Sequence, residues 1–133
     1  MQIVRRDGGE DGPAGPPTEL RTATFTGTVY GDALLGGTDG TTVTSVFFAP
    51  GGRTFWHSHE HGQVLHVLEG RGQVATEGHA PQPIGPGDVV WAPPGEVHWH
   101  GGRPGSMVLH LAVSLGRTTW LGPVSDADYG GGQ

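Results

Sequence analysis

The chain is interrupted at short intervals by residues that break helices. Glycine occupies 26 and proline 11 of its 133 positions. No window of helix length carries an apolar stripe with a 3.6-residue period that glycine or proline leaves intact. Segments rich in β-branched and aromatic residues alternate with Gly and Pro turns. About eight such segments without helices predict an all-β sandwich or barrel.

The predicted strands fall in the middle of the chain. They cover residues 22–30, 41–49, 53–59, 63–69, 72–77, 88–92, 97–100 and 106–114. Both ends are different in composition, because residues 7–17 are nearly all turn-forming or acidic and the chain finishes in Gly-Gly-Gly-Gln. We therefore expect a flexible segment over 1–20, a single β-barrel domain over 21–122 and a loosely placed tail over 123–133.

Charge and composition exclude several classes of function. The formal net charge of −6 argues against nucleic acid or an anionic membrane surface as a partner. The chain contains no cysteine, so it has no disulfide, thiolate metal site or cysteine nucleophile. No apolar run approaches the roughly 20 residues that span a bilayer. The first residues lack the apolar core of a signal peptide, so the expected location is the cytoplasm.

Histidine is concentrated in two short segments. Six of the eight histidines lie within residues 57–66 and 98–100. His57 and His59 alternate along a predicted strand, so both side chains point to one side. Gln63 follows four residues later with the same parity, and the turn at Pro93-Pro94-Gly95 returns His98 toward the mouth of the barrel. We expect these four side chains to bind one divalent metal ion.

The chemistry of this ligand set narrows the choice of metal. Three imidazoles and one amide oxygen suit Mn, Fe, Co, Ni, Cu or Zn, and suit Ca or Mg poorly. Four protein ligands leave one or two coordination positions open, as catalysis requires. Since Gln63 is neutral, a bound ion keeps its full +2 charge, which favours Lewis-acid chemistry over oxygen activation.

These positions resemble the two motifs of the cupin superfamily. The first motif is matched with Gln in place of Glu, and the second with Gly102 in place of Asn. The matching residues are Gly51, His57, His59, Gln63, Gly70, Gly87, Pro93, Gly95 and His98. The resemblance implies a double-stranded β-helix, also called a jelly-roll barrel, with a metal inside it and frequently a homodimer.

A narrower resemblance follows from the same substitution. Small bacterial cupins similar to manganese-dependent hydroxynitrile lyases carry a His, His, Gln, His site. The similarity covers about residues 22–122. It includes the stretches 25–29, 50–51, 53–54, 56–57, 87–91, 94–96, 98–101 and 110–112. It implies manganese, or iron, as the cofactor and cleavage or formation of the C–C bond between cyanide and an aldehyde carbon.

The chain also departs from that subgroup. Glu60 stands in the ligand loop where proline or another small residue is expected. Thr44 and Ser114 stand where a wall of the substrate pocket is expected, and such positions set the choice of substrate. The small-molecule substrate is therefore left open.

A lyase needs a group that moves a proton, and His110 is our candidate. It shares parity with Val108 and Ala112 on a predicted strand, and an imidazole titrates near neutral pH. The alternative is a core histidine bonded to a backbone carbonyl. Thr54 either hydrogen-bonds a substrate oxygen or is a structural strand residue.

The other histidines have less definite roles. His61 is an alternative base or ligand, although its loop position favours exposure. His100 either lines the mouth of the barrel or packs across a dimer. His66 has the wrong parity to face the metal, and His79 lies in a turn. The three tryptophans near the ligands are interpreted mainly as packing residues.

Three functions fit this sequence. The first is a metal-dependent lyase or isomerase acting on a small carbonyl or hydroxy compound. The second is a metal-dependent dioxygenase of the quercetinase or diketone-cleaving type. The third is a non-catalytic binding or sensing module, or a biosynthetic cyclase. Because so small a barrel cannot bury both faces of its sheets alone, we also expect a homodimer.

Overall fold

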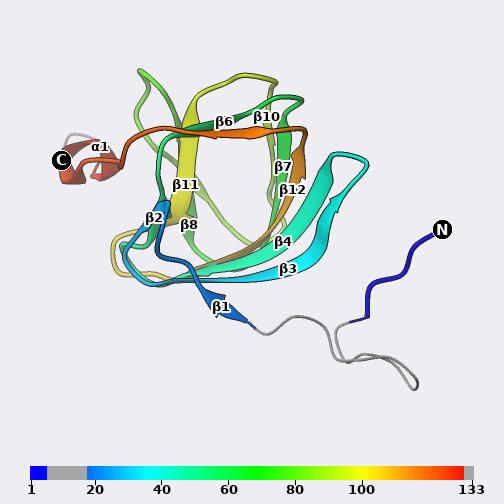
Figure 1. Ribbon diagram of the computed structural model, residues 1–133. Coiled ribbons are helices and arrows are strands. Elements are labelled where there is room, and N and C mark those ends of the chain that lie inside the picture. Colours follow the sequence, from blue (N-terminus) through cyan, green and yellow to red (C-terminus); the bar gives the residue numbers. More distant parts are fainter. Residues whose placement is uncertain (6–17, 131–133) are drawn as a thin grey trace.

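Two curled antiparallel sheets face each other and enclose the interior of the molecule (Figure 1). The computed structural model describes residues 1–5 and 18–130. Residues 6–17, which belong to the expected flexible segment 1–20, and residues 131–133 lie outside this range. The architecture is the predicted all-β jelly-roll barrel in a single domain. Within the described residues, no helix is long and apolar enough to cross a membrane.

The first sheet has six strands and forms the wall that lies beside the predicted pocket. Its spatial order is β1, β3, β4, β12, β7, β10. The strands are β1 (Glu19–Leu20), β3 (Val29–Thr38), β4 (Thr41–Phe48), β12 (Val108–Leu115), β7 (Gln63–Gly70) and β10 (Val89–Ala92).

The second sheet carries the histidine segments. Its main path is β13, β6, β11, β5, β2, with β8 paired to β11 and β9 paired to β8. The strands are β13 (Thr118–Trp120), β6 (His57–His59), β11 (His98–Gly102), β5 (Arg53–Thr54), β2 (Phe25–Thr26), β8 (Gly72–Thr76) and β9 (Gln82–Ile84).

Strand alternation decides which side chains of the first sheet face inward. Along β12, His110, Ala112 and Ser114 are buried, whereas the residues between them are partly exposed on the outer face. Strands β4 and β7 flank β12, with Val46 opposite His110 and Gln63 opposite Ser114. Three neighbouring strands therefore direct polar and small side chains to one region inside the barrel.

The apolar core fills the barrel beside this polar region. Its buried members are Val29, Val46, Phe48, Val67, Ile84 and Val108. Burying each large aliphatic or aromatic side chain contributes about 1.5–3 kcal/mol to folding. Phe48 marks the boundary of the core, because its ring lies 5.1 Å from that of His110 and 5.8 Å from that of His100.

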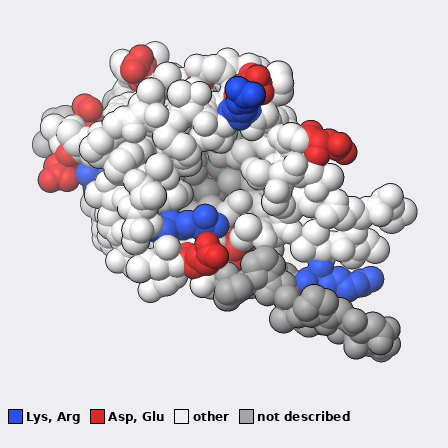
Figure 2. All heavy atoms as spheres, in the orientation of Figure 1, with Lys and Arg blue, Asp and Glu red and all other residues white. Residues whose placement is uncertain are grey.

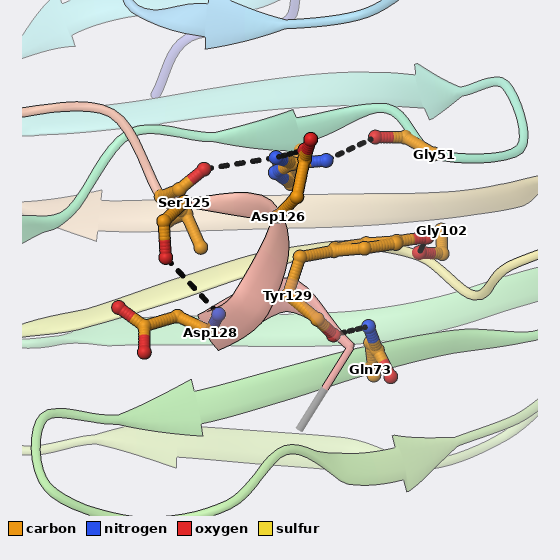
Figure 3. Close-up of polar contacts among 9 residues, drawn as sticks. Gly51, Gln73, Gly102, Ser125, Asp126, Asp128 and Tyr129 are labelled. Carbon is orange, nitrogen blue, oxygen red and sulfur yellow. Dashed lines mark hydrogen bonds and ion pairs between the residues drawn. The ribbon is translucent and has the colours of Figure 1, made fainter. Parts of the chain in front are cut away.

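A short C-terminal helix, α1 (Asp126–Tyr129), covers the outside of β11 (Figure 3). Ser125 caps it by accepting a hydrogen bond from the backbone N–H of Asp128 at 3.1 Å. Tyr129 donates its hydroxyl proton to the carbonyl oxygen of Gly102 at 2.6 Å. Tyr129 packs against the barrel, because its ring lies 5.6 Å from that of Trp99 and is buried.

Several strand boundaries differ from the prediction. Residues 22–30 contain only the short β2 and the start of β3, because the chain turns at Gly27 with φ 79°. Residues 53–59 divide into β5 and β6, since Phe55 and Trp56 bond to loop carbonyls instead of continuing either ladder. Strands β1, β9 and β13 were not predicted, because each has only two or three residues and β9 contains Pro83.

Candidate metal centre and active site

Three of the predicted ligands meet where β6 and β11 run side by side. His57 lies directly opposite His98 in the antiparallel register. The ring centroids of His57 and His98 are 4.4 Å apart, and that of His59 lies 4.9 Å from His57 and 5.6 Å from His98. All three side chains are buried. Strand alternation therefore brings together histidines from two separate segments, as expected.

Gln63 reaches the same point from the first residue of β7. The turn before it depends on Gly62, which has φ 96°, a conformation that residues other than glycine rarely adopt. A Cβ atom at this position would also collide with the ring of Trp91. The amide of Gln63 then donates from Nε2 to the hydroxyl oxygen of Ser114 at 3.0 Å, and its Oε1 lies 3.0 Å from Nε2 of His98.

Backbone carbonyls determine the tautomers of two histidines. His57 donates from Nδ1 to the carbonyl oxygen of Phe55 at 2.8 Å, and His98 donates from Nδ1 to that of Glu96 at 2.9 Å. In the neutral ring, Nε2 is then the atom with the free lone pair. The Nδ1 atom of His59 contacts the hydroxyl of Thr118 at 3.1 Å, and its buried Nε2 has no hydrogen-bond partner.

The distance between Nε2 of His98 and Oε1 of Gln63 indicates whether a metal ion fits between them. In this orientation of the Gln63 amide, Nε2 of neutral His98 and Oε1 of Gln63 are two acceptors 3.0 Å apart and do not hydrogen-bond. Two ligands at right angles on one ion, with bonds of about 2.1 Å, are separated by about 3.0 Å. Together with the orphaned Nε2 of His59, this contact fits a divalent cation.

The buried environment keeps these imidazoles unprotonated, as metal ligation requires. Burial, followed by the neighbouring His98, lowers the pKa of His57 to about 3 and that of His59 to about 4. Burial also lowers the pKa of His98, and the carbonyl of Glu96 partly opposes this effect. At neutral pH, the three rings therefore present lone pairs instead of positive charges.

His100 lies in the same site, although the sequence left its position open. The nearest ligand atoms of His57, His98 and His100 all lie within 4.8 Å of one another. His100 is 3% exposed, so it is an interior residue. The signal that could have placed it is simple alternation, because His98 and His100 are two residues apart on one strand.

His110 does not reach the cavity directly. It is fully buried, and its Nε2 lies 2.9 Å from Nδ1 of His100. Nε2 of His100 and Nδ1 of His110 have no hydrogen-bond partner. Burial lowers the pKa of His110 to about 4 and, together with the nearby His110, holds that of His100 well below its ordinary value. The two rings form a neutral hydrogen-bonded pair. Of the two, His100 borders the cavity and His110 lies behind it.

Thr54 supports this pair from β5. Its hydroxyl oxygen accepts a hydrogen bond from the backbone N–H of His100 at 3.2 Å, and its side chain is 1% exposed. The contact fixes β11 beside the site. The remaining histidines, His61, His66 and His79, are exposed.

A cavity of about 280 Å³ opens in front of these residues. It is lined by Arg21, Thr24, Phe25, Thr42, Thr44, Val46, Thr54, His59, Gln63, His100, Ala112, Ser114, Thr118 and Trp120. Figure 2 shows a hollow at the centre of this face of the molecule. A second hollow of about 450 Å³ touches only His98 among the four predicted ligands. The smaller cavity is therefore the one that borders two of the predicted ligands, His59 and Gln63.

The fold and the site define the class of this protein: it belongs to the cupin family, whose cupin domain matches residues 44–113. Its relatives include the (R)-mandelonitrile lyase of Granulicella tundricola. The two are 46% identical over 111 residues, which cover 79% of this chain and 85% of the relative.

Solved structures agree with this assignment. A cupin-like protein from Thermotoga maritima has a TM-score of 0.79 and 37% identity, over 83% of this chain and 89% of its own. The polyketide cyclase RemF from Streptomyces resistomycificus has a TM-score of 0.70 and 24% identity, over 97% and 90% of the two chains. The second similarity shows the fold alone.

Proposed function

We propose that this cupin is a metal-dependent lyase that cleaves and forms the C–C bond between cyanide and the carbonyl carbon of an aldehyde. The observation that carries the proposal is the convergence of three neutral imidazoles and an amide oxygen beside a small cavity. The 46% identity to an (R)-mandelonitrile lyase supports the same reaction.

The residues that would hold the ion are His57, His59, Gln63 and His98, and we propose manganese or iron. Their lone pairs and buried positions suit a divalent transition metal. Such an ion supplies Lewis acidity, which stabilises negative charge developing on a substrate oxygen. Ser114 holds the amide of Gln63 so that its oxygen faces His98.

The His100–His110 pair supplies the proton acceptor. With a proton on Nδ1 of His100 donated to His110, the buried Nε2 atom of His100 keeps a free lone pair, and the residue borders the cavity. This atom takes the proton of the substrate hydroxyl while the C–C bond to cyanide breaks and the carbonyl forms. The same proton then passes to the departing cyanide. His110 is a positioning residue. Through its hydrogen bond it stabilises the positive charge that His100 carries after taking the proton.

This assignment changes the role predicted for His110. The sequence favoured His110 as the group that moves the proton, whereas the cavity is lined by His100 and not by His110. Thr54 acts through its hydrogen bond to the backbone of His100, and it also borders the cavity.

The proposal is tested by measuring benzaldehyde release from (R)-mandelonitrile with manganese-loaded protein. We expect His100→Ala and His110→Ala to lower kcat by about 100-fold or more, since general base catalysis contributes this much. His79→Ala, which removes an exposed histidine outside both sheets, is the matched control. Oxygen consumption by the iron-loaded protein, without cyanohydrin cleavage, would contradict the lyase and favour a dioxygenase.

We also propose that the outer face of the six-stranded sheet joins two copies of the chain. Apolar side chains gather on this face. They are Tyr30, Val43, Phe47, Val64, Leu68, Val89, Trp91, Leu109, Leu111 and Val113. An exposed apolar area of this kind marks an interface. The test is light scattering: Leu111→Glu should convert a dimer to a monomer, and a wild-type monomer would contradict the proposal.

A further inference from the structure

The walls of the cavity are rich in hydroxyl groups and contain a single arginine. Six hydroxyl side chains line the cavity. They are Thr24, Thr42, Thr44, Thr54, Ser114 and Thr118. Arg21 is the one Arg or Lys among the lining residues, which include no Asp or Glu. The chain as a whole carries a formal charge of −6, so a cavity without acidic groups is a local departure from its surroundings.

Arg21 is directed to the inside of the barrel by the strand that precedes it. Its backbone N–H bonds to the carbonyl oxygen of Val29 at 2.8 Å, just beyond the end of β1. Its guanidinium lies over the bare backbone of Gly31, where a Cβ atom would be only 2.5 Å from Nε and 3.1 Å from Cζ. Gly31 is the register partner of Val46, which also lines the cavity. The glycine therefore provides the space that the guanidinium occupies.

The guanidinium has no partner within the described part of the chain. Its Nε atom is buried without a hydrogen bond, and no described carboxylate forms an ion pair with it. Glu19, two residues earlier, is exposed. Figure 2 shows basic side-chain atoms at the rim of the central hollow, with acidic side-chain atoms next to them. Because a buried donor without a partner is costly, the arrangement suits a ligand that supplies an acceptor.

We propose that Arg21 selects ligands that carry a carboxylate, so that the preferred substrate is a small aldehyde acid or its cyanohydrin, each bearing a carboxylate, instead of a neutral cyanohydrin. The planar guanidinium matches a carboxylate with two parallel hydrogen bonds, and the surrounding hydroxyls accept or donate to the remaining polar atoms. The cavity of about 280 Å³ limits the ligand to a small molecule. The group of the substrate that reacts is taken from the proposed function. The preference for a carboxylate is independent of that function.

The test compares two ligands that differ only at one group, which is a charged carboxylate in the first and a neutral amide in the second. Mandelate and mandelamide share their ring and hydroxyl, and calorimetry measures the binding of each to chelator-treated protein, so that no metal ligates the carboxylate. We expect wild type to bind mandelate about tenfold more tightly than mandelamide, and Arg21→Gln to lose this preference with unchanged mandelamide affinity. Arg21→Lys should keep part of it, because it keeps the charge without the planar fork.

Two further variants sharpen the result. Gly31→Ala keeps the charge of Arg21 but displaces its side chain, so it should reduce the preference as well. Arg103→Gln removes an exposed arginine outside the cavity and should change nothing. The proposal is overturned if wild type shows no preference for mandelate, or if the preference survives in Arg21→Gln. Since no turnover is measured, failure of cyanohydrin cleavage contradicts only the proposed function.

Discussion

At the scale of single residues, Gln63 determines how much charge the site carries. A glutamate at this position would remove one unit of charge from a bound divalent ion. We therefore predict that Gln63→Glu binds the metal more tightly but lowers kcat for cyanohydrin cleavage, on the order of tenfold or about 1.4 kcal/mol in barrier. Chelator competition measures the affinity, and unchanged turnover at full metal loading would contradict the charge argument.

Ser114 is the residue that orients this amide. It accepts the hydrogen bond from Nε2 of Gln63 at 3.0 Å. Removing a partner that orients a metal ligand weakens binding by about 10-fold to 100-fold, so we predict a loss in this range for Ser114→Ala. Ser45→Ala on the outer side of β4 is the matched control. Equal metal affinity in both variants would show that the hydrogen bond from Gln63 to Ser114 does not contribute to metal binding.

The sequence predicted that His57, His59, Gln63 and His98 lie together, because strand alternation and the two cupin-like motifs place them on one side. It did not separate His100 from His110, since both have the parity of inward residues on their strands. Which of the two borders a cavity depends on how the two sheets curve around Phe48, and this is a tertiary property. Arg21 was missed for the same reason, because the space over Gly31 exists only after β1 and β3 pair.

At the scale of elements, contacts of the short helix α1 hold the C-terminal part of the chain against the strands that carry the site. The guanidinium of Arg53 donates to the carbonyl oxygen of Val124 at 2.8 Å and to Asp126 at 2.9 Å, and it lies 4.4 Å from the ring centroid of Tyr129 (Figure 3). Arg53 directly precedes Thr54, so this contact also supports the strand behind His100.

Removal of this contact should destabilise the fold. We predict that Arg53→Met lowers the free energy of unfolding by about 1–3 kcal/mol, because a buried guanidinium loses several partners at once. Tyr129→Phe should cost about 1 kcal/mol, because the carbonyl of Gly102 loses its donor. Urea denaturation measures both, with the exposed Arg103→Met as control. Equal midpoints for all variants would mean that α1 adds nothing to stability.

Short elements were also the least predictable part of the fold. The long strands β4, β7 and β12 were found within two residues of their ends, because alternation over eight residues is a strong pattern. Strands of two or three residues carry no such pattern, and their positions depend on the neighbouring strand. The helix α1 has only four residues, and it forms because Tyr129 packs against Trp99 and the barrel.

At the scale of the whole molecule, five buried histidines couple stability to pH. Their pKa values in the folded state are lowered, to about 3 for His57 and about 4 for His59 and His110, with His98 and His100 lowered as well. In the unfolded chain these histidines bind protons near pH 6.5, whereas in the folded state they stay neutral at this pH. Their contribution to stability is therefore complete above about pH 6.5 and is lost as pH falls toward about 4.

We predict that the chelator-treated protein loses stability steadily between pH 6.5 and about 4. Each histidine contributes at most about 1.4 kcal/mol per pH unit, so even two of them have a large effect. Urea midpoints at pH 7.5, 6 and 5 measure the decline. A midpoint that is constant over this range would mean that these rings accept protons in the folded state.

We propose that one divalent ion binds between His57, His59, Gln63 and His98, which come from two separate segments of the chain. Elemental analysis after dialysis against manganese measures this binding. We expect about one ion per chain in the wild type and in His79→Ala, which changes an exposed histidine, and less than about a tenth of this in His98→Ala. Full occupancy in a folded His98→Ala variant, or no bound metal in the wild type, would show that these side chains do not form a metal site.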